Sequence, residues 1–228
     1  MAVLQRGVGT GVHLDIYSDV ICPWCYLGSR RVAAALERFG DLHADEPVTL
    51  RWRAYELDPG APAEARPMRP VIERKYGPGA FDSMTARLTT LGAADGIDYR
   101  FEQTQRVNTF DAHRLVAWAS SSDTSTVGGP ADRLVDRLFH SYFTEGRNVA
   151  DHPTLVGIAR EVGLDADAAG EVLGSGAFAD DVRADEAAAR EHDITGVPAV
   201  VVNGRALVPG AQDVDTFLRV FERVATDA

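Results

Sequence analysis

The stretch Val12-His-Leu-Asp-Ile-Tyr-Ser-Asp-Val20, followed by Ile21-Cys22-Pro23-Trp24-Cys25, decides the fold. Apolar and polar residues alternate along its first nine positions, which is the period-two pattern of a half-buried strand. The strand runs directly into a pair of cysteines. Pro23 suits the first turn of a helix, where a missing N–H costs nothing. We therefore predict that a strand ends and a helix begins at the cysteines.

The residues that follow continue this pattern. A helix ending at Gly40 is predicted by apolar residues at three- and four-residue steps, namely Trp24, Leu27, Val32, Ala35, Leu36 and Phe39. Alternation returns from Val48 to Leu57 and predicts a second strand. Together these segments form a strand-helix-strand unit.

The middle of the chain is predicted to be helical, because strand patterns disappear between Pro59 and about Asp193. Amphipathic helices are expected at Arg69 to Tyr76, Ala80 to Ala93, Thr109 to Ser121, Pro130 to Thr144, Pro153 to Val162, Asp165 to Leu173 and Ala177 to His192. Ser120 to Gly129 is polar and lacks periodicity, so we expect a mobile loop there.

The C-terminal segment returns to strands, at Ala199 to Val202 and Arg205 to Val208. The turn Asn203-Gly204 between them predicts a hairpin, and a final helix is expected after Asp213. The order β-α-β, helical block, β-β-α predicts an α/β protein with an inserted all-helical subdomain. We assign residues 12–58 and 194–228 to one discontinuous domain and residues 59–193 to the insertion.

Composition excludes some classes of partner. The 228-residue chain is 45% hydrophobic, enough for a sizeable core, and its net charge of −11 disfavours nucleic acid and anionic membrane surfaces. Met1 to Gly11 contains no apolar run long enough for a signal peptide or a membrane span. We therefore expect a cytoplasmic protein.

Cys22 and Cys25 are the only cysteines, and their position favours redox chemistry. A sulfur at the first turn of a helix faces unpaired N–H groups and the positive end of the helix dipole, so its thiolate form is favoured. Cys22 would be that nucleophile, and Cys25, one turn further on, would resolve a mixed disulfide. A structural zinc needs four ligands, but the six histidines form no second clustered pair, so no metal is expected.

A second element is Gly196-Val197-Pro198, just before the predicted strand at Ala199. Proline is acceptable at the start of a strand, and the simplest interpretation is the end of a loop. With the cysteines it suggests a more specific role. A cis bond before Pro198 would direct the Val197 backbone toward the redox pair, where a bound polypeptide can pair with it.

Several further segments accompany these two elements in the same order. They are Ser18-Asp19-Val20-Ile21, Tyr55-Glu56-Leu57-Asp58-Pro59, Asn108-Thr109-Phe110-Asp111-Ala112-His113-Arg114-Leu115, Phe139-His140-Ser141-Tyr142-Phe143-Thr144-Glu145-Gly146 and Gly210-Ala211-Gln212. On these residues the sequence resembles the DsbA superfamily, specifically its cytoplasmic FrnE-like branch, across nearly the whole chain.

The resemblance implies a thioredoxin fold with a helical insertion, and disulfide exchange with protein or peptide thiols. A reducing cytosol would set the direction of exchange toward reduction or isomerisation. The resemblance implies that Cys22 attacks, Cys25 resolves, and Pro23 and Trp24 tune the redox poise. It also supports a cis bond before Pro198, with Val197 and Pro198 binding the substrate. No cofactor is implied, although glutathione remains open as a co-substrate.

The chain departs from better-known relatives at two positions. DsbA has histidine in place of Trp24, and the acidic residue that relatives keep six positions before the first cysteine corresponds here to Ile16. Asp19 could instead move protons at the redox site, or simply cap a turn. Asn108 and His113 could line the cleft over Cys22; alternatively, Asn108 caps a helix and His113 is a partly buried polar residue.

Two other classes of function stay open. One is a glutathione-dependent isomerase or transferase, similar to the kappa transferases and 2-hydroxychromene-2-carboxylate isomerases. Those relatives need no resolving cysteine, so the presence of Cys25 disfavours this class. The other is a chaperone-like peptide-binding module whose thiols act as a redox sensor.

Overall fold

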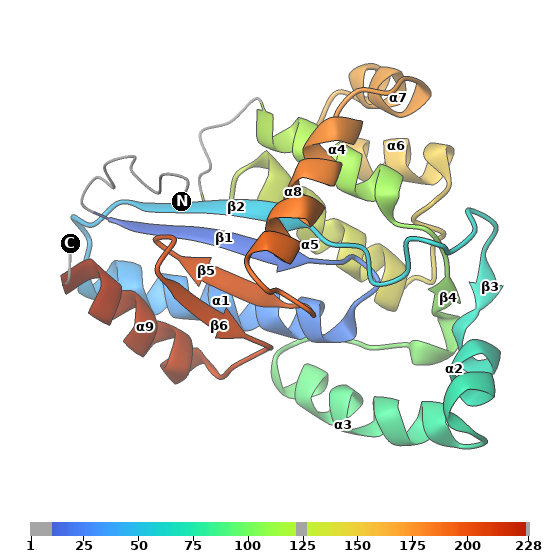
Figure 1. Ribbon diagram of the computed structural model, residues 1–228, viewed down its shortest axis with the longest axis horizontal. Coiled ribbons are helices and arrows are strands. Elements are labelled where there is room, and N and C mark those ends of the chain that lie inside the picture. The colour runs from blue at the N-terminus through green and yellow to red at the C-terminus, as the bar shows by residue number, and fades with distance from the viewer. Residues whose placement is uncertain (1–10, 122–126, 227–228) are drawn as a thin grey trace.

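The central sheet has the strand order β2-β1-β5-β6 in a computed structural model that describes residues 11–121 and 127–226 (Figure 1). The bounds of its strands are β1 Val12–Ser18, β2 Val48–Ala54, β5 Ala199–Val202 and β6 Ala206–Pro209. β1 pairs parallel with β2 and antiparallel with β5. Because β1 is central, Ile16 lies between Trp52 and Val200 in the register and is buried.

Helices α1 (Pro23–Leu42) and α9 (Val214–Thr226) pack against each other, and α9 also contacts β1 and β5. Figure 1 shows the two helices along the same side of the sheet. Phe39 and Phe221 meet edge to face between them, with centroids 6.3 Å apart. The predicted end of the first helix was wrong, since α1 continues through Gly40. The helix closes where the His43 N–H donates to the Phe39 carbonyl at 2.8 Å.

The insertion contains the predicted helices, with ends shifted by one or two residues. Their bounds are α2 Met68–Tyr76, α3 Ala80–Ala94, α4 Phe110–Ser121, α5 Pro130–Phe143, α6 His152–Glu161, α7 Ala166–Gly174 and α8 Ala179–Glu191. The expectation that strands are absent from this region was wrong: β3 (Arg66–Pro67) pairs with β4 (Gln105–Arg106), next to a 3-10 turn at Phe101–Gln103. A two-residue ladder leaves no periodicity in the sequence.

Two predictions concern segments that this description covers only in part. The loop expected at Ser120 to Gly129 includes residues 122–126, and the segment Met1 to Gly11 includes residues 1–10, all of which lie outside the described residues. The proposed domain boundaries stay a prediction. Within the part of the chain that is described, no helix is long and apolar enough to cross a bilayer.

The insertion covers the sheet from two directions. Helices α4 and α8 both pack on β2, and Figure 1 shows α8 crossing the sheet. On the other side an aromatic cluster joins the insertion to α1. Tyr26 of α1 stacks on Phe139 of α5 with centroids 5.1 Å apart and meets Tyr99 edge to face at 5.8 Å. This contact places part of the insertion directly behind the cysteines.

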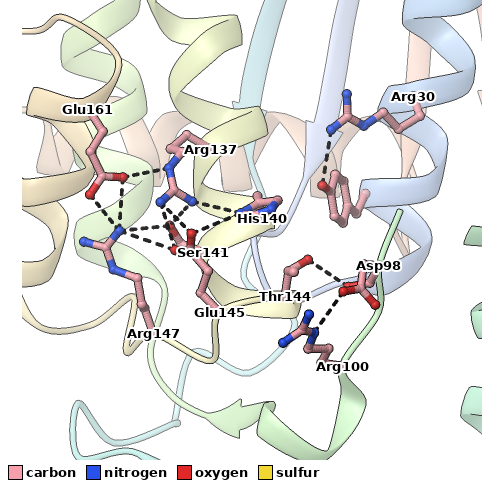
Figure 2. A network of polar contacts seen from close by, with 11 residues as sticks. Arg30, Asp98, Arg100, Arg137, His140, Ser141, Thr144, Glu145, Arg147 and Glu161 are labelled. Carbon is pink, nitrogen blue, oxygen red and sulfur yellow. Dashed lines mark hydrogen bonds and ion pairs between the residues drawn. The ribbon is translucent and has the colours of Figure 1, made fainter. Parts of the chain in front are cut away.

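Ion pairs hold α5 to the helix that follows it. Figure 2 shows Arg137 between Glu145 and Glu161, at 2.8 and 2.7 Å, with Arg147 also 3.0 Å from Glu161. Each of these side chains is partly exposed, so single pairs contribute little, but a shared network fixes the relative position of the helices. The same view shows Arg30 of α1, which donates to the Tyr26 hydroxyl at 3.3 Å.

Candidate active site

Cys22 lies at the junction of strand and helix, as predicted. It is the N-cap residue of α1 with extended backbone angles (φ −89°, ψ 113°), and Pro23 occupies the first helical position. Its Sγ accepts the Cys25 N–H at 3.4 Å. The Cys22 N–H in turn donates to the Asp19 carbonyl at 3.0 Å, which fixes the turn before the helix. The sulfur therefore occupies the place of a capping oxygen, where anions are stabilised.

Cys25 lies beneath Cys22 and is 2% exposed. Burial raises the pKa of the Cys25 thiol well above its ordinary value, and the neighbouring Cys22 raises it further. The Ser18 hydroxyl and the Asp19 backbone lower this pKa but do not outweigh burial. Both cysteines are free thiols in this structure. The buried thiol needs a route for its proton before it can act as a nucleophile.

The peptide bond between Val197 and Pro198 is cis, which confirms the expectation for this position. The Cys22 thiol donates to the Val197 carbonyl at 3.6 Å. A backbone hydrogen bond holds this loop in place, since the Gly210 N–H donates to the Pro198 carbonyl at 2.7 Å. These contacts bring a segment 175 residues away in sequence against the first cysteine.

Gly28 was missed by sequence reasoning. A Cβ at this position would lie 3.1 Å from Pro198 Cγ and 3.6 Å from Ala211 Cβ. The absence of a side chain thus lets α1 approach the Pro198 loop one turn after Cys25. The sequence contained only a weak sign of this role, a glycine inside an amphipathic helix, which usually has a packing reason.

Tyr99 was also missed. Its hydroxyl donates to the Pro23 carbonyl, so a residue of the insertion holds the first turn of α1. Trp24 next to it points outward with 36% of its surface exposed, and the Arg87 guanidinium lies 6.0 Å from its ring. Pro23 is thus held at the helix start, whereas the Trp24 side chain is exposed beside Arg87.

Asp19 and His113 are buried rather than lining an open cleft, which for His113 agrees with the interpretation as a buried polar residue. Asp19 is fully buried and His113 is 6% exposed, with His113 Nε2 3.5 Å from Asp19 Oδ1. Asp19 Oδ2 accepts the Leu57 N–H at 2.7 Å. Asp19 therefore fixes the segment after β2, and its contact with His113 joins this segment to α4. Asp19 thus satisfies a buried backbone donor there, whereas His113 meets Asp19 only through this electrostatic contact.

Asn108 contributes to the start of α4. Its Oδ1 accepts the Phe110 N–H at 3.0 Å, which agrees with the capping interpretation, and its Nδ2 donates to Glu56 Oε1 at 3.0 Å. Partial burial raises the pKa of Glu56, His113 lowers it, and Glu186 and Asp19 raise it; together they bring this pKa to about 7. Glu56 was quoted for the family resemblance without a role. Only the fold shows that it joins the Asp19 and His113 cluster.

The sheet order, the Cys22 cap and the cis Pro198 loop together define a thioredoxin fold with a helical insertion. A family model described as a DSBA-like thioredoxin domain matches residues 13–222. The chain belongs to this family of DsbA-like oxidoreductases. A solved structure of a probable DsbA oxidoreductase from Streptomyces coelicolor is 33% identical with a TM-score of 0.85, over 95% of this chain and 91% of that chain.

Two more distant structures share the fold. The cytosolic disulfide reductase DsbM from Pseudomonas aeruginosa, also solved with GSH, is 18% identical with a TM-score of 0.63, over 95% of this chain and 100% of that chain. A 2-hydroxychromene-2-carboxylate isomerase is 17% identical with a TM-score of 0.65, over 94% of this chain and 97% of that chain. At these identities the likeness concerns the fold alone.

Proposed function

We propose that this protein catalyses thiol-disulfide exchange through Cys22 and Cys25, with protein or peptide disulfides as substrates. The observation that carries the proposal is the placement of Cys22 Sγ. It caps a helix, accepts the Cys25 N–H and contacts the Val197 carbonyl. An attacking sulfur, a resolving sulfur and a backbone group for the substrate therefore lie within one turn of helix and one loop.

The reaction proceeds in two displacements. The Cys22 thiolate attacks a substrate disulfide, forms a mixed disulfide and releases one substrate thiolate. Cys25 then attacks the Cys22 sulfur, so that the substrate leaves fully reduced and Cys22 is joined to Cys25. Two electrons pass from the cysteine pair to the substrate, and the reverse sequence oxidises a substrate dithiol.

A pocket beside the cis loop supports a peptide substrate. Its volume is about 300 Å³, and Thr195, Val197, Pro198, Leu207 and Gly210 are among the residues that line it. Val197 precedes Ala199, the first paired residue of β5, so an extended peptide beside Val197 can use main-chain hydrogen bonds as well as a side-chain pocket. A pocket of this size also accepts glutathione, the co-substrate left open by the sequence.

The direction of exchange is proposed as reduction or isomerisation in the cytoplasm. The FrnE-like sequence resemblance and the similar fold of a protein named a cytosolic disulfide reductase support this proposal. A reducing cytosol keeps the cysteine pair reduced unless an oxidant is supplied. The equilibrium reduction potential of the pair against glutathione tests the direction, because a potential above that of the glutathione pool would make the protein an oxidant.

Reduction of insulin disulfides tests the activity. Cys22→Ser should abolish turnover, whereas Cys25→Ser should accumulate a mixed disulfide on Cys22 that is visible by mass spectrometry. Unchanged turnover in both variants would show that the assigned roles are wrong. Oxidised wild-type protein should contain an internal bond between the two sulfurs.

A glutathione-dependent isomerase is the second candidate, supported by the shared fold of the 2-hydroxychromene-2-carboxylate isomerase. It requires a bound glutathione thiol but no resolving cysteine. Turnover of an aromatic isomerase substrate by Cys25→Ser, with glutathione present, would favour this candidate. Disulfide exchange remains preferred because Cys25 lies in direct contact with Cys22.

A further inference from the structure

Two buried polar atoms beneath the cysteines lack a partner. Ser18 and His113 are each 6% exposed, and neither Ser18 Oγ nor His113 Nε2 has a hydrogen-bond partner within residues 11–121 and 127–226. The 3.5 Å approach of His113 Nε2 to Asp19 is an electrostatic contact rather than an aligned hydrogen bond. Leaving such an atom without a hydrogen bond is unfavourable, so two of them beside one cavity indicate a bridging molecule.

The two residues that carry these atoms both line one small cavity. It offers about 20 Å³ to the centre of a water molecule, and its lining includes Ser18, His113, Arg53 and Asp185 among apolar side chains such as Val116 and Val135. One ordered water needs roughly 10–15 Å³ by this measure, together with two to four polar partners. The cavity is large enough for one water. The polar partners of that water would be one hydroxyl, one imidazole nitrogen and the neighbouring charged groups.

The cavity extends a path that begins at Cys25. Ser18 is near enough to the Cys25 thiol to lower its pKa, although the contact is not an aligned hydrogen bond, and Ser18 also lines the cavity. At the far end, His113 reaches the Asp19 carboxylate. A hydroxyl, a water and an imidazole in sequence can pass a proton, because each accepts one proton and donates another.

We propose that a water molecule bound between Ser18 Oγ and His113 Nε2 carries the Cys25 proton to His113 while Cys25 resolves the mixed disulfide. This inference rests on the proposed disulfide exchange and assigns its second step. It makes His113, a residue of the helical insertion, the proton acceptor for the thioredoxin-fold domain. The Ser18 hydroxyl passes the Cys25 proton to this water.

The proton and the bonding electrons move together in this step. The Cys25 S–H bond breaks, its proton passes to Ser18 Oγ, the Ser18 proton passes to the water, and a water proton binds His113 Nε2. The Cys25 sulfur forms a bond with Cys22 Sγ as the bond from Cys22 to the substrate sulfur breaks. The substrate leaves as a thiolate with that electron pair. His113 begins as the neutral tautomer protonated on Nδ1 and ends as an imidazolium, whose proton later returns to solvent.

Charged groups face His113 from several elements. Two acidic residues follow strands, Asp19 after β1 and Glu56 after β2. Glu186 of α8 forms a side-chain hydrogen bond with Glu56. Arg53 of β2 and Asp185 of α8 line the same cavity and are paired with each other at 2.7 Å. Helix α5 contributes apolar Val135 to the lining. Acidic residues thus face His113 from three elements, and the guanidinium that lines the cavity is itself paired with Asp185.

A two-phase reaction with 5,5′-dithiobis(2-nitrobenzoate) tests the proposal. Attack by Cys22 on this disulfide releases one thionitrobenzoate, and resolution by Cys25 releases the second, so stopped-flow absorbance separates the steps. His113→Gln can hold the water but cannot accept its proton. We expect the ratio of second-phase to first-phase rate to fall by about 10²-fold, and the remaining second phase to accelerate about tenfold per pH unit as hydroxide replaces the lost acceptor.

Matched variants make the outcomes distinct. Ser18→Ala, which keeps the backbone pairing of β1, should reduce the same ratio, whereas His140→Gln, a partly exposed histidine that contacts Arg137 and Glu145, should retain it. Absence of any first phase in the wild type would overturn the proposed function itself. A normal second phase in Ser18→Ala or in His113→Gln, with the wild-type pH profile, would overturn the proton path alone. If His113→Gln does not fold, Ser18→Ala decides.

Discussion

Replacing Gly92 by alanine should loosen the support of the active-site turn. Gly92 is buried in α3, and a Cβ there would lie 2.4 Å from Tyr99 Cδ2 and 2.5 Å from Cε2. Ordinary carbon contacts lie near 3.5–4.0 Å, so the ring must retreat by about 1 Å. It has little room, because Tyr99 stacks on Phe101 at 4.8 Å and meets Phe143 edge to face at 5.3 Å.

The expected change in the free energy of unfolding is the sum of opposing effects. Overpacking of this kind costs about 1–3 kcal/mol, and loss of the Tyr99 bond to Pro23 adds about 1 kcal/mol. The higher helix propensity of alanine offsets about 1 kcal/mol of this loss of stability. We expect a net loss of about 1–3 kcal/mol in the free energy of unfolding, together with slower disulfide exchange, since Pro23 begins the helix that holds Cys22.

Urea unfolding and insulin reduction measure these two effects. Gly40→Ala is the matched control, because it also lies in a helix but its Cβ would meet nothing within 4 Å. It should raise stability by up to about 1 kcal/mol and leave exchange unchanged. Equal stability changes in the two variants would refute the reasoning that Tyr99 blocks a side chain at position 92.

Three further outcomes are expected. Arg114→Met should lower the free energy of unfolding by about 3–5 kcal/mol, because the buried guanidinium donates to Asp111 and to the carbonyls of Val172, Ser175 and Ala177; a loss below about 1 kcal/mol in urea unfolding would contradict this. Glu56→Gln should flatten the pH dependence of stability. The pKa of Glu56 is about 7 in the folded protein against an ordinary 4.5, so between these values the native state retains a proton that the unfolded chain releases. Wild-type stability therefore falls as pH rises through this window. Parallel profiles for variant and wild type would count against that assignment. Trp24→His should make the reduction potential less negative, since an imidazolium beside the helix start stabilises the reduced dithiol; an unchanged potential against glutathione would exclude this effect.

The sequence alone was sufficient for the main helices and strands, though not for β3 and β4, and for the position of the cysteine pair. Alternation from Val12 and helical spacing after Pro23 are local patterns, and they placed the cysteines at a strand-helix junction. Asn203-Gly204 likewise predicted the hairpin. Local patterns succeed here because turn chemistry and side-chain periodicity act between near neighbours in the chain. The cis bond before Pro198 came from the family resemblance, since the dipeptide itself favours trans.

Only the tertiary structure decided how the site is supported. Gly28 matters because Pro198 approaches it, Tyr99 because its hydroxyl reaches Pro23, and His113 because it is buried near Asp19 rather than facing a cleft. These contacts join positions 76 or more residues apart, so no window of sequence contains both partners. Packing brought them together, and the burial that packing imposes governs the pKa of Cys25 and Glu56.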